Sequence, residues 1–379
     1  MDRYCTKNNK DGKSKIIIFI ATLLIFINLP IFIYSKNNEA FAEGNKSGYV
    51  VIECRTNRVL KANNEHLSMP MASTTKIMTA LVVIEHCNLE EVITINKEAV
   101  GIEGSSIYLK LGQKISVKDL LYGLMLRSGN DAAIALAIHT AGSVEKFVKM
   151  MNDKALELGL KNTQFKNPHG LSQKGHYSSA YDLAVIASTG LKNETFKEIV
   201  STKMHVIKGE SEEETHYFAN KNRILYNYSG GNGVKTGYTK EAGRCLVASS
   251  ERNGMQIVAV ALNYYDYFNL CSELMDYAHE NYHLEKIGNT ETAYAVVKVK
   301  RGKKYKNIEL YLEEDRYYPL KNDGSEKVNL EIESVDEIVA PHDKSNSCGS
   351  VKFYVGNNLI FVEKLYTIYN IEKKLISFF

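Results

Sequence analysis

A serine and a lysine three positions apart, Ser73 and Lys76, are the first residues in the sequence whose types and spacing suit a reaction. On a helix, residues three apart share a face, so their side chains can touch. A serine hydroxyl is a poor nucleophile until a base within hydrogen-bond reach removes its proton. A lysine at its ordinary pKa near 10.4 is protonated at neutral pH. We therefore expect Lys76 to be buried, beside a second cation such as Lys235, so that its pKa falls.

The spacing alone is weak evidence, because Ser143 and Lys146 repeat it. There we expect a helix-capping serine and a surface lysine. Two further motifs accompany Ser73: Ser128-Gly129-Asn130, which begins 55 residues later, and Lys235-Thr236-Gly237, which begins another 107 residues on. By itself the first is typical of a turn between helices, and the second of a strand end. The glycines at 230–233 do not make Lys235 part of a phosphate loop, since a strand pattern and not a helix follows it.

These three motifs, in this order, are those of penicillin-binding proteins and class A β-lactamases. Longer stretches resemble one branch of that group, the type-5 D-alanyl-D-alanine carboxypeptidases, and they are residues 70–80, 167–171, 235–239 and 242–249. The resemblance covers roughly residues 45–365. It implies a penicillin-binding/β-lactamase-like catalytic domain of the α/β (α+β) class, with a sheet flanked by helices. A small all-β C-terminal domain is implied after it.

The resemblance also implies roles for single residues. Ser73 would attack the carbonyl of a D-Ala-D-Ala peptide bond, Lys76 would be the base, and Ser128 would pass a proton to the departing amine. The substrate-binding residues would be Asn130, Lys235, Thr236, Gly237 and Tyr238, with the backbone N–H groups of Ser73 and Tyr238 holding the oxyanion. No metal or organic cofactor is required. His169 and His176 are expected to support the loop around the site.

The implied reaction removes the terminal D-alanine from peptidoglycan stem pentapeptides, and β-lactam antibiotics would be covalent inhibitors. A D,D-endopeptidase would use the same acylation and stays open as an alternative. A β-lactamase needs a deacylating glutamate in a Glu-x-x-Leu-Asn segment, and the nearest match, at Glu157, has Lys161 in place of the asparagine. A non-catalytic envelope scaffold would be expected to show decayed motifs, whereas every motif residue here is intact.

Composition excludes several other classes of protein. The chain has 379 residues, 44% of them hydrophobic and 24% charged, which is ordinary for globular domains and rules out wholesale disorder. After residue 42 the basic and acidic residues balance at 41 each, so no nucleic-acid partner is expected. Five cysteines remain there without a Cys-x-x-Cys pair, and we expect most to be small buried side chains.

The first 42 residues are typical of an export signal. A basic stretch over 3–15 precedes an apolar run over 16–27, and Ala40-Phe41-Ala42 supplies a small-x-small cleavage site. We therefore expect cleavage before Glu43 and a location at the outer face of the cytoplasmic membrane or in the cell wall. The competing interpretation extends the apolar run to Tyr34 and keeps it as an uncleaved anchor.

Periodicity divides the rest of the chain into three parts. Residues 43–284 are expected to form the catalytic domain, with strands near both ends and helices between them. Residues 285–363 alternate apolar and polar positions and are expected to form the β domain, including a hairpin turn at Gly356-Asn357. Residues 364–379 place apolar side chains on one helical face, which predicts either a terminal helix packed on the body or a peripheral membrane contact.

Overall fold

The computed structural model describes residues 46–207 and 215–374. The leader expected over residues 1–42 lies outside this part of the chain, as do residues 375–379 of the terminal segment. None of the helices within the described ranges is long and apolar enough to cross a membrane.

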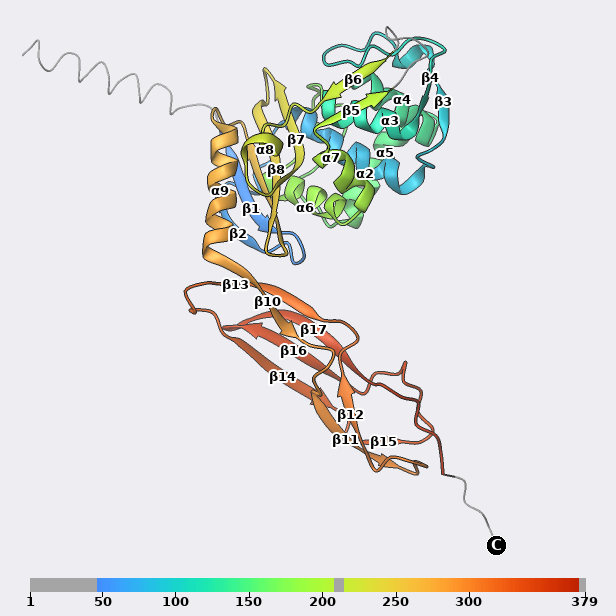
Figure 1. Ribbon diagram of the computed structural model, residues 1–379, viewed down its shortest axis with the longest axis vertical. Helices are drawn as coiled ribbons and strands as arrows, with labels where there is room; N and C mark the ends of the chain where they lie inside the picture. Colours follow the sequence, from blue (N-terminus) through green and yellow to red (C-terminus); the bar gives the residue numbers. More distant parts are fainter. Residues whose placement is uncertain (1–45, 208–214, 375–379) are drawn as a thin grey trace, which may run out of the picture. The chain divides into compact units, whose positions relative to one another are not determined.

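A five-stranded antiparallel sheet forms the centre of the catalytic domain (Figure 1). Its strand order is β2-β1-β9-β8-β7, and the strands are β1 (Gly48–Glu53), β2 (Val59–Asn63), β7 (Gly231–Thr239), β8 (Gly243–Arg252) and β9 (Met255–Leu262). Alternate residues of β8 and β9 enter two different hydrophobic cores, so both faces of the sheet are covered. Helix α9 (Tyr267–Asn281) packs on one face, and α6 (Ala180–Leu191) packs on the sheet from the other core.

The helices inserted between β2 and β7 surround α2 (Lys76–His86), which is buried from Lys76 through Val83. The 3-10 turn η1 (Ala72–Thr75) leads into it. The other elements of this region are β3 (Val92–Thr94), η2 (Lys97–Ala99), β4 (Lys114–Ser116), α3 (Val117–Tyr122), the π-helical turn η3 (Gly123–Arg127), α4 (Asn130–Ala141), α5 (Val144–Glu157), α7 (Glu194–Ser201), β5 (Met204–Ile207), β6 (His216–Ala219) and α8 (Ile224–Asn227). Apolar periodicity in the sequence predicts helices at 73–88, 117–126, 131–141 and 143–158, and the structure confirms a helical segment at each.

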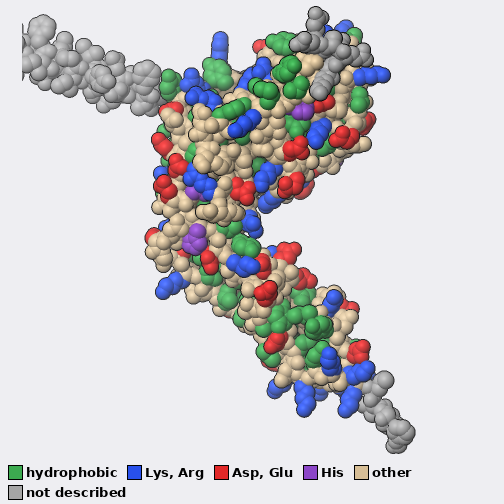
Figure 2. All heavy atoms as spheres, viewed as in Figure 1, with side chains coloured by type: hydrophobic (Ala, Val, Ile, Leu, Met, Phe, Trp, Pro, Cys, Tyr) green, Lys and Arg blue, Asp and Glu red, His purple; other side chains and the backbone are tan. Residues whose placement is uncertain are grey.

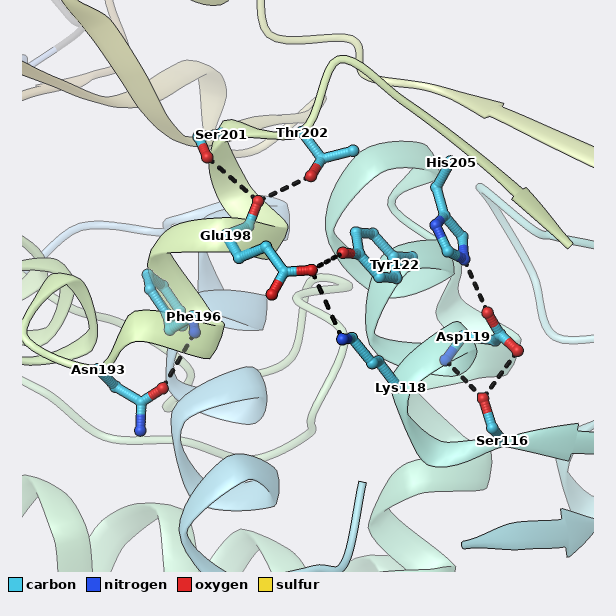
Figure 3. Close-up of polar contacts among 10 residues, drawn as sticks. All are labelled: Ser116, Lys118, Asp119, Tyr122, Asn193, Phe196, Glu198, Ser201, Thr202 and His205. Atoms are coloured by element: carbon cyan, nitrogen blue, oxygen red, sulfur yellow. Dashed lines mark hydrogen bonds and ion pairs between the residues drawn. The ribbon is translucent and has the colours of Figure 1, made fainter. Parts of the chain in front are cut away.

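A polar cluster joins α3, α7 and β5 (Figure 3). The Tyr122 hydroxyl donates to Glu198 Oε1 at 2.7 Å, and Lys118 Nζ lies 3.5 Å from the same oxygen. His205 stacks on the Tyr122 ring with centroids 3.7 Å apart, while its Nε2 lies 2.7 Å from Asp119 Oδ1. Helix α3 continues into the turn that ends at the Ser-Gly-Asn motif, and α7 packs on β7, the strand of the Lys-Thr-Gly motif. The cluster therefore connects the elements that position these two motifs.

The C-terminal residues form two sheets. Strand β10 (Tyr282–Gly288) pairs with β13 (Arg316–Lys321), and a six-stranded sheet has the order β14-β16-β17-β12-β11-β15. Its strands are β11 (Ala295–Lys300), β12 (Asn307–Tyr311), β14 (Val328–Ser334), β15 (Glu337–Val339), β16 (Gly349–Val355) and β17 (Asn358–Thr367). A core of its own, with Phe353 and Leu310 fully buried, holds it together. The hairpin at Gly356-Asn357 is confirmed as the β16–β17 turn.

The helix expected from residue 364 onward is wrong for residues 364–374. Strand β17 runs on to Thr367, and it pairs with β16 and then with β12. Leu365 and Thr367 are both buried, which is the period of two expected of a strand. Ile371 then pairs with His342 in an isolated bridge. The apolar spacing in this short segment fits both periods, and the open edges of β16 and β12 decide between them.

Candidate active site

Ser73 lies in the turn η1, and the residue before it has an uncommon backbone. Ala72 has φ +49°, in the left-handed region that residues other than glycine rarely adopt. Its carbonyl oxygen accepts a hydrogen bond from Thr75 Oγ1 at 2.8 Å. Gly170, with φ +91°, packs so closely here that a Cβ atom on it would lie 2.0 Å from the Ala72 oxygen. The loop around Gly170 therefore holds the turn that presents the serine.

Lys76 begins α2, and its amine touches three oxygens. The Nζ atom lies 3.2 Å from Ser73 Oγ, 2.7 Å from Asn130 Oδ1 and 2.5 Å from the carbonyl oxygen of His169. A neutral amine has two N–H bonds and one lone pair. The two carbonyl acceptors can take both N–H bonds, and this leaves the lone pair for the Ser73 hydroxyl.

The surroundings of Lys76 favour that neutral form. Its side chain is fully buried, and burial lowers its pKa well below the ordinary value because a charged amine loses its hydration. The positive charge of Lys235 lowers the pKa further, and Lys221 adds to this effect, whereas Asp131 opposes it. Lys76 is therefore buried beside a second cation, as expected, and its role as a base stays a prediction.

The Ser-Gly-Asn motif sits at the start of α4. Ser128 is buried, has φ +66°, and ends the π-helical turn η3 two residues before Asn130. Asn130 contacts Lys76 with its oxygen and donates from Nδ2 to the carbonyl of Glu103 at 2.6 Å. The neighbouring Asp131 accepts hydrogen bonds from the backbone N–H groups of Ile107 and Leu109, each at 3.1 Å. The motif thus fixes the loop over residues 103–109 as well as the amine.

The Lys-Thr-Gly motif lies on β7, the edge strand of the central sheet. A Cβ atom on Gly237 would lie 3.1 Å from the backbone nitrogen of Ser73, so glycine allows the strand to approach Ser73 closely. Lys235 is buried, and its Nζ donates to the carbonyl of Thr236 at 3.0 Å. Tyr238 exposes 66% of its surface. The structure thus brings Gly237 of β7 close to Ser73 of η1.

Sequence reasoning missed one cation, Lys221. Burial lowers its pKa, and the charge of Arg127 lowers it further. Lys221 in turn helps burial to lower the pKa of Lys235 to about 7. No motif marks Lys221, since it lies in the loop before α8 and reaches this region only through the fold. Lys221 and Lys235 thus place positive charge beside Lys76, which suits a carboxylate ligand.

The two histidines near the site bond to the backbone that holds it. His176 Nδ1 accepts from the N–H of Lys166 at 3.0 Å, so its Nε2 carries the proton that faces Thr75 Oγ1 at 2.8 Å. Burial lowers the pKa of His176 to about 4, and that of His169 to about 3, with Lys76 as the next cause in both. His169 Nδ1 accepts from the N–H of Leu171 at 3.1 Å. These contacts agree with supporting roles.

Glu157, the nearest match to a β-lactamase glutamate, and Ser143, the second Ser-x-x-Lys serine, lie at the two ends of α5. Glu157 is exposed at the end of α5 and pairs with Lys154 at 2.8 Å. Ser143 caps α5 by accepting from the backbone N–H of Lys146, as predicted.

The cysteines at 54, 245, 271 and 348 are buried, and Cys87 is half-buried. Within residues 46–207 and 215–374, no cluster of three or more His, Cys, Asp or Glu side chains could hold a metal ion.

Comparison with known proteins gives two family matches. Residues 36–266 match the D-alanyl-D-alanine carboxypeptidase family, and residues 282–373 match the penicillin-binding protein 5 C-terminal domain. The D-alanyl-D-alanine carboxypeptidase DacF of Bacillus subtilis is 37% identical over 348 residues, which are 88% of this chain and 89% of that protein. The D-alanyl-D-alanine carboxypeptidase of a Streptomyces species (strain K15) is 41% identical over 206 residues, 50% of this chain and 71% of that one.

Solved structures of similar proteins indicate the same family as the sequence matches. Penicillin-binding protein 5 from Haemophilus influenzae superposes with a TM-score of 0.73 at 28% identity, covering 86% of this chain and 97% of that one. A mutant of the Streptomyces K15 DD-transpeptidase covers 61% of this chain and 96% of its own, at 35% identity and a TM-score of 0.57. The chain belongs to the D-alanyl-D-alanine carboxypeptidase family, and with its penicillin-binding/β-lactamase-like catalytic domain and its all-β C-terminal domain it is a serine-type, low-molecular-weight penicillin-binding protein of peptidoglycan metabolism.

Proposed function

We propose that Ser73 is the residue acylated during removal of the terminal D-alanine from peptidoglycan stem pentapeptides. The observation that carries this proposal is the 3.2 Å contact of Ser73 Oγ with the buried amine of Lys76. In the first step the serine oxygen bonds to the penultimate D-alanine carbonyl, and its proton passes to the Lys76 lone pair. The carbon–nitrogen bond then breaks, and Ser128 relays a proton to the departing amine. Water hydrolyses the resulting ester in the second step.

The remaining motif residues bind the substrate in this proposal. Lys235 and Thr236 take the terminal carboxylate, which explains a preference for a free C-terminus, and Asn130 orients the substrate amide. The oxyanion lies between the backbone N–H groups of Ser73 and Tyr238, and Gly237 keeps that space open. The short approach of β7 to Ser73 supports this arrangement. Loss of one such donor typically costs about 3 kcal/mol of transition-state stabilisation.

The proposed location is outside the cytoplasmic membrane, after export directed by the first 42 residues. β-Lactams are proposed as covalent inhibitors that acylate Ser73. The membrane contact expected for residues 364–379 is proposed only from Ile368 onward, because Leu365 and Thr367 are buried in the β domain.

The test is release of D-alanine from a synthetic peptide that ends in D-Ala-D-Ala, with Ser73→Ala as the inactive control. A second candidate is transfer of the acyl group to an amine instead of water, which the likeness to the Streptomyces K15 DD-transpeptidase favours. Adding glycine as an acceptor separates the two, because a transpeptidase yields the glycine-extended peptide. A D,D-endopeptidase would instead cleave cross-linked dimers in preference to the linear peptide. The proposed reaction would be overturned if the protein released no D-alanine from the linear peptide and cleaved no cross-linked dimer.

A further inference from the structure

The position of Ser128 is set by its backbone. Within the part of the chain that the structure describes, the Ser128 hydroxyl forms no hydrogen bond, although the residue is buried. The N–H groups of Ser128 and Gly129 both donate to the carbonyl oxygen of Gly123, the second at 3.2 Å. These two bonds close the π-helical turn η3, and Gly123 directly follows Tyr122 in the chain. The place of the serine therefore depends on how the end of α3 is held.

Tyr122, the last residue of α3, is held from two sides (Figure 3). Its ring is buried, and its hydroxyl donates to Glu198 Oε1 at 2.7 Å. His205 stacks on the ring with the two planes 8° from parallel, and Asp119 of α3 fixes His205 in turn. Burial and the bond to Glu198 raise the pKa of Tyr122 to about 12, so the hydroxyl keeps its proton and remains a donor at neutral pH. Both the ring and the hydroxyl are thus fixed in orientation.

Glu198 connects this tyrosine to the strand of the Lys-Thr-Gly motif. It lies on α7, and α7 packs on β7. The packing is close, since a Cβ atom on Gly233 would lie 3.1 Å from Val200 Cγ2 of α7. Gly233 precedes Lys235 by two residues. The bond between Tyr122 and Glu198 therefore links the turn that ends at the Ser-Gly-Asn motif to the strand that carries Lys235.

The chemistry proposed for Ser128 is sensitive to such a link. In the proposed function this serine relays a proton to the departing amine. The relay must lie within hydrogen-bond reach while the carbon–nitrogen bond breaks, because an amine is a poor leaving group until it is protonated. Proton transfer of this kind contributes about 10²- to 10⁴-fold to a rate, and a misplacement of about 1 Å costs on the order of 100-fold. A small shift of η3 would slow this step first.

We propose that Tyr122 is a positioning residue that acts through Ser128, with Glu198 as its anchor. This inference rests on the relay that the proposed function assigns to Ser128. Neither Tyr122 nor Glu198 belongs to a motif, and that proposal gives neither of them a contact with the substrate. The role is selective: loss of the bond between them slows a reaction that needs the relay and spares one that does not.

The experiment compares two substrates with the same acyl group and the same terminal carboxylate. One is a peptide that ends in D-Ala-D-Ala, and the other is a thioester in which 2-mercaptopropionate replaces the last D-alanine. A thiol has a pKa of about 8.5 and leaves as a thiolate without a proton. Ser128→Ala should lower kcat/KM for the peptide on the order of 100-fold, and Tyr122→Phe about 10-fold. Each should lower kcat/KM for the thioester by less than about threefold.

Two variants of Glu198 separate the bond from the charge. Glu198→Gln should restore nearly the wild-type rate, because its amide oxygen still accepts from Tyr122. Glu198→Ala should behave like Tyr122→Phe, and the variant with both changes should be no slower than either alone, since all three lack the same bond. Figure 2 shows acidic and basic side chains mixed over the visible face of the catalytic domain. Glu198 is exposed, so water and salt screen its charge, and the rescue by Gln reports the bond.

Tyr228→Phe is the matched control. The Tyr228 hydroxyl donates to Asp276 of α9, also at 2.7 Å, and Tyr228 packs against the core on the α9 face of the sheet. This variant loses the same kind of bond and should process both substrates at the wild-type rate. The active fraction of every variant is counted by its covalent adduct with benzylpenicillin, so that misfolded chains do not lower the measured rate.

Three outcomes would overturn the inference: equal slowing of both substrates in Tyr122→Phe, a wild-type rate on the peptide in that variant, or equal slowing of both substrates in Ser128→Ala. The last would also remove the relay from the proposed function. Failure of the wild type to release D-alanine from the peptide would overturn the proposed function itself. That result is seen before any variant is made, so the two failures are distinguishable.

Discussion

The amine of Lys76 lies 3.2 Å from the hydroxyl of Ser73, and the two other oxygens within hydrogen-bond distance of that amine belong to carbonyl groups. A carbonyl can only accept hydrogen bonds. This arrangement satisfies both N–H bonds of a neutral amine and directs its lone pair at the serine. Burial and Lys235, which both lower the pKa of Lys76, act in the same direction. Geometry and electrostatics therefore both favour Lys76 in the proposed role of the base.

The first prediction concerns which of two similar serines reacts. Incubation with benzylpenicillin should give a one-to-one covalent adduct in the wild type and none in Ser73→Ala, as measured by intact-protein mass. Ser143 occurs in the same Ser-x-x-Lys spacing, but it caps α5. Ser143→Ala should keep the adduct and lose about 1 kcal/mol of stability through the missing cap. An adduct that survives in Ser73→Ala would remove Ser73 as the nucleophile, and rapid drug consumption without an adduct would point to a β-lactamase.

The second prediction concerns the pH dependence of acylation. Lys76 acts as a base only when neutral, so the acylation rate should fall as the pH falls through the pKa of Lys76 in the folded protein. Lys221 is one of the charges that lower this pKa. Lys221→Gln should therefore raise the pKa of Lys76 and move the acidic limb of the rate profile to higher pH.

Stopped-flow measurement of acylation by a chromogenic cephalosporin across pH gives this profile. Lys161→Gln removes an exposed lysine that does not act on Lys76 and should leave the limb in place. A limb that stays fixed in Lys221→Gln as well would show that a group other than Lys76 controls the step.

Some features of the site follow from local sequence and some do not. Ser73 and Lys76 are found because three residues along a helix return to the same face, and Ser143 is recognised as a cap by the same reasoning. Lys221 has no local signal, since it becomes a neighbour of Lys235 only when the loop before α8 folds beside β7. The carbonyl of His169, a main-chain atom, is likewise invisible to an analysis of side-chain types.

The fold shows the same division. The apolar alternation over residues 246–262 predicts β structure, and the helical period over about 267–282 predicts α9, because each pattern runs over many residues. The turn that divides the first stretch into β8 and β9 is not predicted. The segment at 364–374 fails because Leu365 fits a helical face with Ile368 and a strand face with Thr367 equally well. Its pairing with β16 and β12 settles the conformation, and those partners are distant in sequence. Strands β10 and β13 are missed for a related reason, since their burial is partial and depends on each other.

The third prediction concerns the cost of a buried cation. Lys235 has a pKa of about 7 in the folded protein, chiefly through burial, against an ordinary value near 10.4. Between these values the unfolded chain binds a proton that the folded chain does not, so the free energy of unfolding falls as the pH drops from about 10 to 7. Lys235→Met should remove this loss. The variant should be more stable than the wild type at pH 7, by a few kcal/mol at most, and should lose activity.

Urea unfolding of both proteins at several pH values tests this, with the exposed Lys146→Met as the control for lost charge alone. The stability difference between Lys235→Met and the wild type should shrink as the pH rises toward 10. A difference that does not change with pH would mean that burial of Lys235 carries no protonation cost.

The last prediction concerns the turn before the nucleophile. In Gly170→Ala the new methyl group would lie 2.0 Å from the Ala72 carbonyl oxygen, which is backbone and cannot swing aside. The turn must move, and because Ala72 precedes Ser73 directly, the hydroxyl moves away from Lys76. We expect acylation by benzylpenicillin to slow about 10- to 100-fold. Gly142 is the matched control, since it has φ +78° and nothing within 4 Å of a new Cβ. Gly142→Ala carries backbone strain of about 1 kcal/mol and should acylate at the wild-type rate. Equal acylation rates for Gly170→Ala and the wild type would show that the loop around Gly170 does not position Ser73.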